Sequence, residues 1–266
     1  MRQGVLDLRA FYATPLGRVT RQMISRKIVE AWSDGSGLDF LALGYSTPFL
    51  DAVRPRAARV VAAMPASQGV EAWPAGQRNL ACLVDEMALP IPNALFDRVL
   101  AVHALEESDS PIVLLREIRR VLAPSGRVIL AVTARHGLWA DAESSPFGHG
   151  RSFSRAQLER LLHEAELEPA GWTRALYAPP LPWAWRWAEG FEQVGARLWP
   201  PFAGVILMEA VKTSFAVRAR PVRALAPARP AAQPVQARAA LALERVDSQP
   251  TRPSIGPTME GSAPCE

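Results

Sequence analysis

Short apolar runs alternate along the chain with segments in which apolar residues recur every three or four positions. The short runs predict strands that are buried on both faces, as in a parallel sheet. They lie at 38–43, 59–63, 80–84, 97–102, 126–132, 171–177 and 204–212. The periodic segments predict helices over 11–32, 110–122 and 154–166. This alternation of strand and helix predicts an α/β fold with a mostly parallel sheet.

Two of the helices carry start signals in the sequence. Ser110 and Pro111 suit the cap and the first turn of a helix over 110–122, and a proline-glycine turn follows that helix. Ser154 and Gln157 have the spacing of a capping box, in which each side chain bonds the backbone N–H of the other residue. We therefore expect well-defined helices at both places.

The composition changes after about residue 215. Segment 216–266 is rich in alanine, arginine and proline and contains no aromatic residue. Such a segment cannot bury enough apolar surface to offset the entropy lost on ordering, so we predict a disordered tail behind a folded domain at 1–215. A short helix at 236–245, or a tail that docks a partner, is the alternative.

The overall composition is that of a globular protein. The chain has 266 residues, of which 49% are hydrophobic and 21% charged, which suits one domain with additions. The longest apolar run, near 203–211, is half the ~18 residues that a membrane span needs. The N-terminus carries charges where a secretory signal would be apolar. Cys82 and Cys265 are too far apart to suggest a disulfide framework or a metal cluster. These features predict a cytoplasmic protein.

The formal net charge of +4 does not by itself indicate a nucleic-acid-binding surface. Lys27 and Lys212 are the only lysines, and the arginines are scattered along the chain. A nucleic-acid-binding protein would gather its basic residues on one element and add stacking aromatic residues. Nucleic-acid binding is therefore the weakest of the functional hypotheses.

The middle of the chain carries the most specific motif. An acid, Asp85, is followed by Leu-Pro at 89–90, Phe-Asp at 96–97, the helical run LREIRRVL at 115–122 and a Pro-Ser-Gly turn at 124–126. This order resembles the class I S-adenosylmethionine-dependent methyltransferases, specifically the type 11 small-molecule group. The helical run by itself is most simply a packed helix with its charged residues facing water.

The resemblance implies a doubly wound, seven-stranded, mostly parallel sheet of the Rossmann-like methyltransferase kind, with order 3-2-1-4-5-7-6 and an antiparallel last strand. Segment 38–43 would be its first strand and 204–212 its seventh. The helix over 11–32 would flank the site, and 133–157 would lie on the substrate side. The implied cofactor is S-adenosylmethionine, and the implied partner is a small-molecule acceptor.

In such sheets ligands bind beyond the carboxyl ends of the strands. By the resemblance, Asp85 accepts a hydrogen bond from the adenine amino group; a solvated loop acid is the alternative. The cofactor-binding candidates all lie in loops that follow the first four strands. They are Gly44, Tyr45, Ser46, Thr47, Met64, Asp85, Glu86 and His103.

The chain departs from the family pattern at the methionine and ribose ends of the cofactor. Ala42 stands at the position of an acid, and of the family's alternate glycines only Gly44 is kept, with Ser46 and Pro48 in place of the others. Met64 replaces the acid that binds the ribose hydroxyls. Two unpaired hydroxyl groups would cost about 1–3 kcal/mol each.

Two interpretations of this departure remain open. In the first, the site is reshaped, and the hydroxyl groups of Tyr45, Ser46 and Thr47 bind the cofactor with Gln68 or Trp73 at the nucleoside. In the second, the cofactor site is vestigial, and the fold serves a non-catalytic binding or regulatory role. Titration with the cofactor separates the two.

Methyl transfer needs positioning and sometimes a base, but neither a nucleophilic residue nor a metal. His103, at the end of the fourth strand, is a base or a substrate contact, or else a rim histidine. His149 and Arg151 are substrate-side candidates in a glycine-flanked loop that is otherwise a simple connection. His136 and His163 show no metal-ligand spacing with them.

Tryptophans are concentrated in one irregular stretch near the end of the predicted domain. They are Trp183, Trp185, Trp187 and Trp199. Such a group suits the wall of an apolar substrate pocket, a lid, a dimer contact or a contact with a membrane surface. The structural alternative is that it packs over the edge of the sheet. The acceptor atom and the oligomeric state are not determined by the sequence.

Overall fold

A computed structural model of the chain describes residues 3–213, except 33–34, 52 and 182. Its centre is one sheet with the strand order β3-β2-β1-β4-β5-β7-β6, which confirms the predicted topology. The strands are β1 Asp39–Gly44, β2 Arg59–Pro65, β3 Ala81–Val84, β4 Phe96–Val102, β5 Leu122–Thr133, β6 Glu168–Ala175 and β7 Val205–Val211. β7 is antiparallel to both β5 and β6, and the other pairings are parallel.

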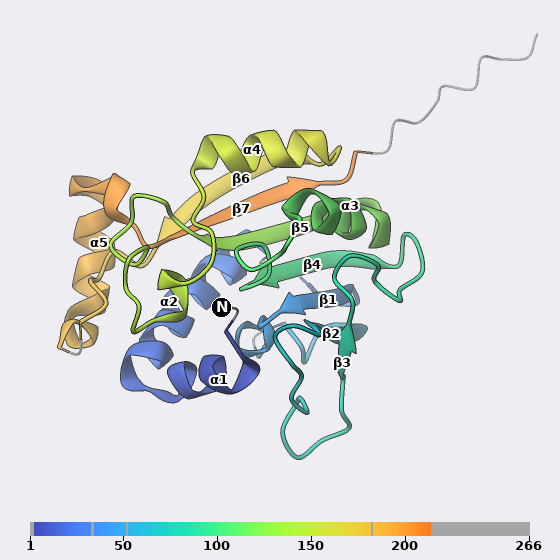
Figure 1. Ribbon diagram of the computed structural model, residues 1–266, viewed down its shortest axis with the longest axis horizontal. Coiled ribbons are helices and arrows are strands. Elements are labelled where there is room, and N and C mark those ends of the chain that lie inside the picture. Colours follow the sequence, from blue (N-terminus) through green and yellow to red (C-terminus); the bar gives the residue numbers. More distant parts are fainter. Residues whose placement is uncertain (1–2, 33–34, 52, 182, 214–266) are drawn as a thin grey trace, which may run out of the picture. The chain divides into compact units, whose positions relative to one another are not determined.

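Helices cover both faces of this sheet (Figure 1). They are α1 Val5–Ala13, α2 Pro15–Ala31, α3 Pro111–Val121, α4 Arg155–Glu164 and α5 Ala188–Leu198, with short 3-10 turns η1 Thr47–Phe49, η2 Pro146–Gly148, η3 Ala184–Trp187 and η4 Pro200–Phe202. The apolar sides of α3 and α4 pack on one face of the sheet. Those of α1 and α2 pack on the other face. The capping box of Ser154 and Gln157 is present at the start of α4.

The N-terminal helix differs from the prediction of one helix over 11–32. The structure has two helices that meet at Thr14, because Pro15 has no N–H and disfavours helical geometry in the residue before it. The hydroxyl oxygen of Thr14 caps α2 by accepting the N–H of Gly17 at 3.0 Å. A Cβ on Gly17 would lie 2.0 Å from the carbonyl oxygen of Phe11, so the close elbow requires glycine there. The break lets α1 turn back over the carboxyl ends of the strands, where Tyr12 contacts His103.

The connections after β1 and β2 explain why α1 and α2 cover this face. In the described residues, the segment between β1 and β2 contains only the turn η1, and the segment between β2 and β3 contains no helix. These connections leave apolar side chains of the sheet uncovered, among them Phe40, Ala62 and Met64. The two N-terminal helices bury them.

The predicted tail at 216–266 lies outside the described residues. Among the described helices, none combines the length and the apolar character that crossing a bilayer requires.

Candidate functional site

The carboxyl ends of β1 and β4 are joined by the loop that follows β1. Gly44 adopts a left-handed φ of +71°, and a Cβ there would lie 2.5 Å from the carbonyl oxygen of Val102. Ser46 is fully buried; its Oγ lies 2.7 Å from the carbonyl oxygen of Leu43 and accepts the N–H of Val102 at 3.0 Å. Gly44 and Ser46 therefore hold two strands together, and the space that a cofactor glycine would leave open is filled by the chain's own backbone.

Aromatic side chains cover this loop. The ring of Tyr45 is buried and stacks on that of Tyr12 from α1, with the ring centroids 5.8 Å apart. Phe49 meets Tyr12 edge-on at 5.5 Å. Phe147, from η2, lies 4.8 Å from the ring of His103. Three distant segments thus close over the carboxyl end of β4.

His103 sits directly after β4 in a left-handed conformation, with φ of +51°. Such a conformation costs energy in a residue with a side chain and persists only where the surroundings fix it. Here Nε2 lies 2.7 Å from the hydroxyl oxygen of Tyr12, and the carbonyl oxygen accepts the side-chain amide N–H of Gln68 at 3.0 Å. Burial lowers the pKa of the imidazole from 6.5 to about 3, so His103 is neutral at physiological pH.

Glu106 lies three residues further on and is only 4% exposed. Its Oε1 accepts the backbone N–H of Thr133 at 3.2 Å, while its Oε2 and the hydroxyl of Thr133 have no hydrogen-bond partner among the described atoms. Burial raises the pKa of Glu106 to about 8, and Glu107 adds to the rise. Burial, and then the nearby Glu106, raise the pKa of Tyr12 well above its usual range. Neither Tyr12 nor Glu106 was among the residues predicted from the sequence, because Glu106 opens the polar stretch 106–110, which gives no sign of burial.

The end of β2 does not present a polar group to a ligand. Met64 is fully buried within the apolar core. Gln68 links the loop after β2 to α1, since its carbonyl oxygen accepts the N–H of Val5 at 2.8 Å. Thr47 is also buried, in η1. The hydroxyl and amide groups that the reshaped-site interpretation assigned to the cofactor thus lie inside the protein in this conformation.

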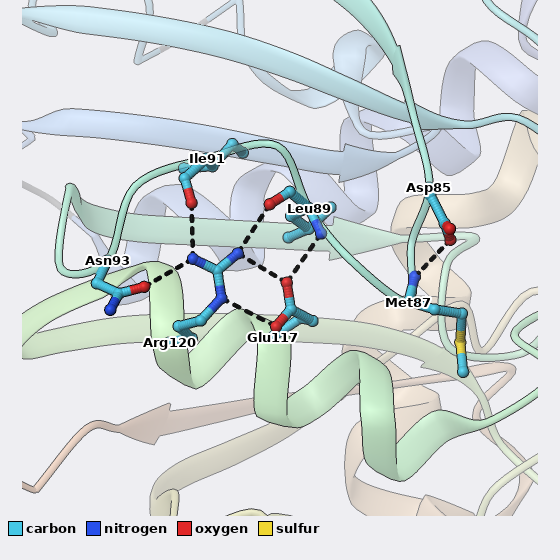
Figure 2. Close-up of polar contacts among 7 residues, drawn as sticks. All are labelled: Asp85, Met87, Leu89, Ile91, Asn93, Glu117 and Arg120. Carbon is cyan, nitrogen blue, oxygen red and sulfur yellow. Dashed lines mark hydrogen bonds and ion pairs between the residues drawn. The ribbon is translucent and has the colours of Figure 1, made fainter.

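Asp85 is the exception among the cofactor candidates, because its side chain is exposed. Its Oδ1 accepts the N–H of Met87 at 2.9 Å and so shapes the loop that follows β3 (Figure 2). Glu86, the next residue, is buried and already interacts with other groups of the protein. Asp85 could therefore meet a ligand from solvent without rearrangement of the core.

The loop after Asp85 is held by two charged residues of α3 (Figure 2). The guanidinium of Arg120 donates to the carbonyl oxygens of Leu89 and Ile91, at 2.8 and 2.7 Å, and to both carboxylate oxygens of Glu117. Glu117 also accepts the N–H of Leu89 at 2.8 Å. The expectation that all the charged residues of this helix face only water was wrong for these two, because the loop crosses over them. The hydrogen bonds from Arg120 lower the pKa of Glu117.

The substrate-side candidates lie in the loop before α4. The ring Nε2 of His149 lies 2.9 Å from the carbonyl oxygen of Glu143. The side chain of Arg151 is exposed, but its backbone N–H donates to the carbonyl oxygen of Glu106 at 2.8 Å. This loop therefore reaches the buried glutamate through its backbone. In the described part of the chain, no three potential metal ligands come together.

Comparisons with known proteins give the family. A sequence profile described as a methyltransferase domain matches residues 33–170, which is more than half of the chain. The chain belongs to the methyltransferase domain family. It is a class I, S-adenosylmethionine-dependent methyltransferase, as the resemblance implied, and S-adenosylmethionine is the cofactor.

Solved structures agree on the fold. An S-adenosylmethionine-dependent methyltransferase of Thermotoga maritima is 15% identical, with a TM-score of 0.54 over 79% of this chain and 96% of that chain. One of Archaeoglobus fulgidus is 12% identical, with a TM-score of 0.53 over 72% and 94%. One of Mesorhizobium loti is 14% identical, with a TM-score of 0.51 over 70% and 96%. No curated protein sequence matches the chain.

The cofactor does not fit the methyltransferase in this conformation. Its expected position, beyond the ends of β1 and β4, is filled by the rings of Tyr12, Tyr45 and Phe147. Five of the surface hollows in the described part of the chain are formed by other residues, and none of these five is lined by Gly44, Tyr45 or any other cofactor candidate. The structure is therefore that of a closed form.

Proposed function

We propose that the methyltransferase acts on a small-molecule acceptor, in a site that α1 covers. The observation that supports this most is the contact between Tyr12 of α1 and His103 at the end of β4, with 2.7 Å between the hydroxyl oxygen and Nε2. A site sealed by a helix of the same chain suits a molecule small enough to be enclosed. A protein or nucleic-acid acceptor would instead need an open groove.

In this proposal α1 must move to admit ligands. It is joined to α2 by the break at Thr14, which can act as a hinge. Few polar contacts hold it to the sheet edge. In the described part of the chain they are the Tyr12–His103 contact, the Val5–Gln68 hydrogen bond at 2.8 Å and an ion pair at 3.7 Å between exposed Arg9 and partly buried Glu71. Ligand affinity is then reduced by the free energy needed to open this cover.

Once α1 has moved, His103 has the properties of a proton acceptor. Nε2 loses its contact with Tyr12, and solvent relieves the burial that lowers the imidazole pKa in the closed form, so this pKa returns toward its ordinary value of 6.5. A neutral imidazole nitrogen can accept the proton of an acceptor's N–H or O–H group. His149 and Arg151 stay substrate-side candidates on this proposal, and a cytoplasmic location stays a prediction of the sequence.

Two measurements on the full chain test the proposal. Calorimetry with S-adenosylmethionine and S-adenosylhomocysteine should give micromolar dissociation constants. With radiolabelled donor and cell extract, the label should enter the small-molecule fraction and not the protein or nucleic-acid fractions. Label in the protein or nucleic-acid fraction would contradict the proposal of a small-molecule acceptor. Absence of heat up to millimolar ligand would favour the non-catalytic binding role.

A further inference from the structure

Helix α5 has the reverse of the usual amphipathic arrangement. The residues it buries are Ala188, Glu192 and Gly195, two of which are small and one of which is an acid. Gly195 packs directly on Tyr177, which lies two residues after β6. A Cβ on Gly195 would lie 2.5 Å from the Cβ of Tyr177. The buried carboxylate of Glu192 accepts the backbone N–H of Tyr177 at 2.8 Å. The helix is thus attached through its small and polar side.

The large apolar residues of α5 face solvent. Val194 and Leu198, at positions i and i+4, share one side of the helix with Trp187, the last residue of η3 immediately before it, and these residues are 44%, 71% and 69% exposed. The turns before and after α5 continue this surface with Trp183 and Phe202, which are about half exposed. A helix of a water-soluble domain normally turns such a face toward the core. The surface therefore indicates a partner that takes up apolar side chains.

Within this surface the tryptophans line a shallow, open hollow of about 460 Å³. Its lining is almost entirely apolar and consists of Trp183, Trp187, Gly190, Phe191, Val194 and Trp199. The helix lies at the margin of the molecule, next to the end of the sheet and away from α3 (Figure 1, orange). Nothing in the described chain covers this face.

Cationic side chains flank the same surface. Arg186 precedes α5, with its guanidinium 5.5 Å from the ring centre of Trp185, and Arg197 lies in the last turn. A groove along the other side of the helix is lined by Arg26, Lys27 and Arg174, together with the acids Glu30 and Glu192. Lys27 is paired with Glu30 there, and Glu189 is the exposed acid of α5 itself, so the excess of positive charge is modest.

We propose that α5 and its flanking turns form a membrane-surface binding site, in which Trp183 and Trp187 enter the headgroup region of an anionic lipid bilayer. Indole rings favour this interface because they are apolar with one polar N–H. Arginines beside an inserted apolar face attract anionic headgroups. A second copy of this chain is the competing occupant, and the experiment distinguishes it. The inference does not depend on the acceptor or on methyl transfer.

Flotation with vesicles tests it on the full chain. Vesicles of phosphatidylcholine with phosphatidylglycerol should bind the protein, vesicles of phosphatidylcholine alone should bind it more weakly, and salt should weaken the difference. The double variant Trp183→Ser, Trp187→Ser should lower the partition coefficient at least about tenfold, because binding scales with the inserted apolar area. Tryptophan emission of the wild type should shift to shorter wavelength on binding.

The matched control is Leu6→Ser, which removes an exposed apolar side chain from α1 and should leave vesicle binding unchanged. Both variants should keep the wild-type thermal unfolding midpoint, since all three side chains are more than half exposed. No binding to either vesicle, or equal binding of the double variant, overturns the proposal. So does a lipid-free dimer, seen by light scattering, that the tryptophan substitutions dissociate.

Discussion

The hydroxyl oxygen of Tyr12 lies 2.7 Å from Nε2 of His103, although the two residues are 91 positions apart in the sequence. Both groups are buried, and their contact joins the N-terminal helix α1 to the carboxyl end of β4. That end of the sheet is where the cofactor of a class I methyltransferase belongs. The contact therefore closes the site in the conformation described.

Tyr12→Phe should change stability and cofactor affinity in opposite directions. Loss of the hydroxyl leaves buried Nε2 of His103 without its partner, so the free energy of unfolding should fall by about 1–2 kcal/mol. Because α1 is then held less tightly, S-adenosylmethionine should bind more tightly, by up to about tenfold for each 1.4 kcal/mol. Urea unfolding and calorimetry measure the two quantities.

The control for this pair of measurements is Leu6→Ala, on the exposed side of α1. It should change the free energy of unfolding by no more than about 0.5 kcal/mol and leave affinity unchanged. If Tyr12→Phe weakens cofactor binding instead, α1 is part of the binding surface and not a cover.

Glu106 should make the protein less stable as pH rises. Its pKa is about 8 in the folded chain against an ordinary value of 4.5, so the folded state binds more protons between these values than the unfolded state does. The free energy of unfolding then falls with rising pH in this window, with a slope of up to about 1.4 kcal/mol per pH unit. His103 acts in the opposite sense, because its lowered pKa makes stability fall as pH decreases from 6.5 toward 3.

Glu106→Gln isolates the contribution of the glutamate. The variant keeps the shape of the side chain but cannot ionise, so its unfolding free energy should lose the downward slope between pH 5 and 8 that Glu106 gives the wild type. Urea unfolding across this range measures it. Parallel pH profiles for the two proteins would show that Glu106 titrates normally.

Arg120→Ala should destabilise the fold through the loop after β3. The guanidinium satisfies the carbonyl oxygens of Leu89 and Ile91 and the carboxylate of Glu117, so its loss should cost about 1.5–3 kcal/mol in urea unfolding. Arg120→Lys should recover only part of this, because an ammonium group lacks the planar fork. Arg116→Ala is the control: that residue lies on the same helix, 3.8 Å from exposed Glu164, and should cost less than about 1 kcal/mol. Equal costs at both positions would refute a specific role for Arg120.

Asp85→Asn tests the one cofactor candidate that is exposed in the closed form. If its carboxylate accepts the adenine amino group, calorimetry should show affinity for both S-adenosylmethionine and S-adenosylhomocysteine reduced by about tenfold. Asp141→Asn, another exposed aspartate that no candidate role involves, should bind like the wild type. Unchanged affinity in Asp85→Asn would remove the adenine assignment.

Much of the fold could be predicted because each element is encoded locally. The run Leu38 to Leu43 is short and apolar at nearly every position, as expected of a strand buried on both faces, and β1 occupies Asp39–Gly44. The motif around 115–122 carried the family and, through it, the strand order. The helix break at Pro15 was equally local, but the periodicity of the apolar residues continues across it and concealed it.

The candidate site was less predictable, because burial depends on segments that are distant in sequence. Ser46 and Tyr45 were expected to face a cofactor, and their polar groups gave no indication that Val102 and Tyr12 would occupy that space. The exposed apolar side of α5 was unpredictable for the same reason. A periodic pattern shows that a helix has an apolar and a polar side, but it does not show which side packs against the rest of the domain.

The sequence by itself determined that the chain forms an α/β sheet, since strand and helix follow from the periodicity of neighbouring residues, and its motif from Asp85 to Gly126 pointed to the methyltransferase family. Only the tertiary structure decided that α1 closes the end of that sheet and that Glu106 is buried beside the end of β5. Whether a polar group faces water or the interior depends on which remote side chains pack against it. Its solvation and its pKa are therefore set by the assembled fold.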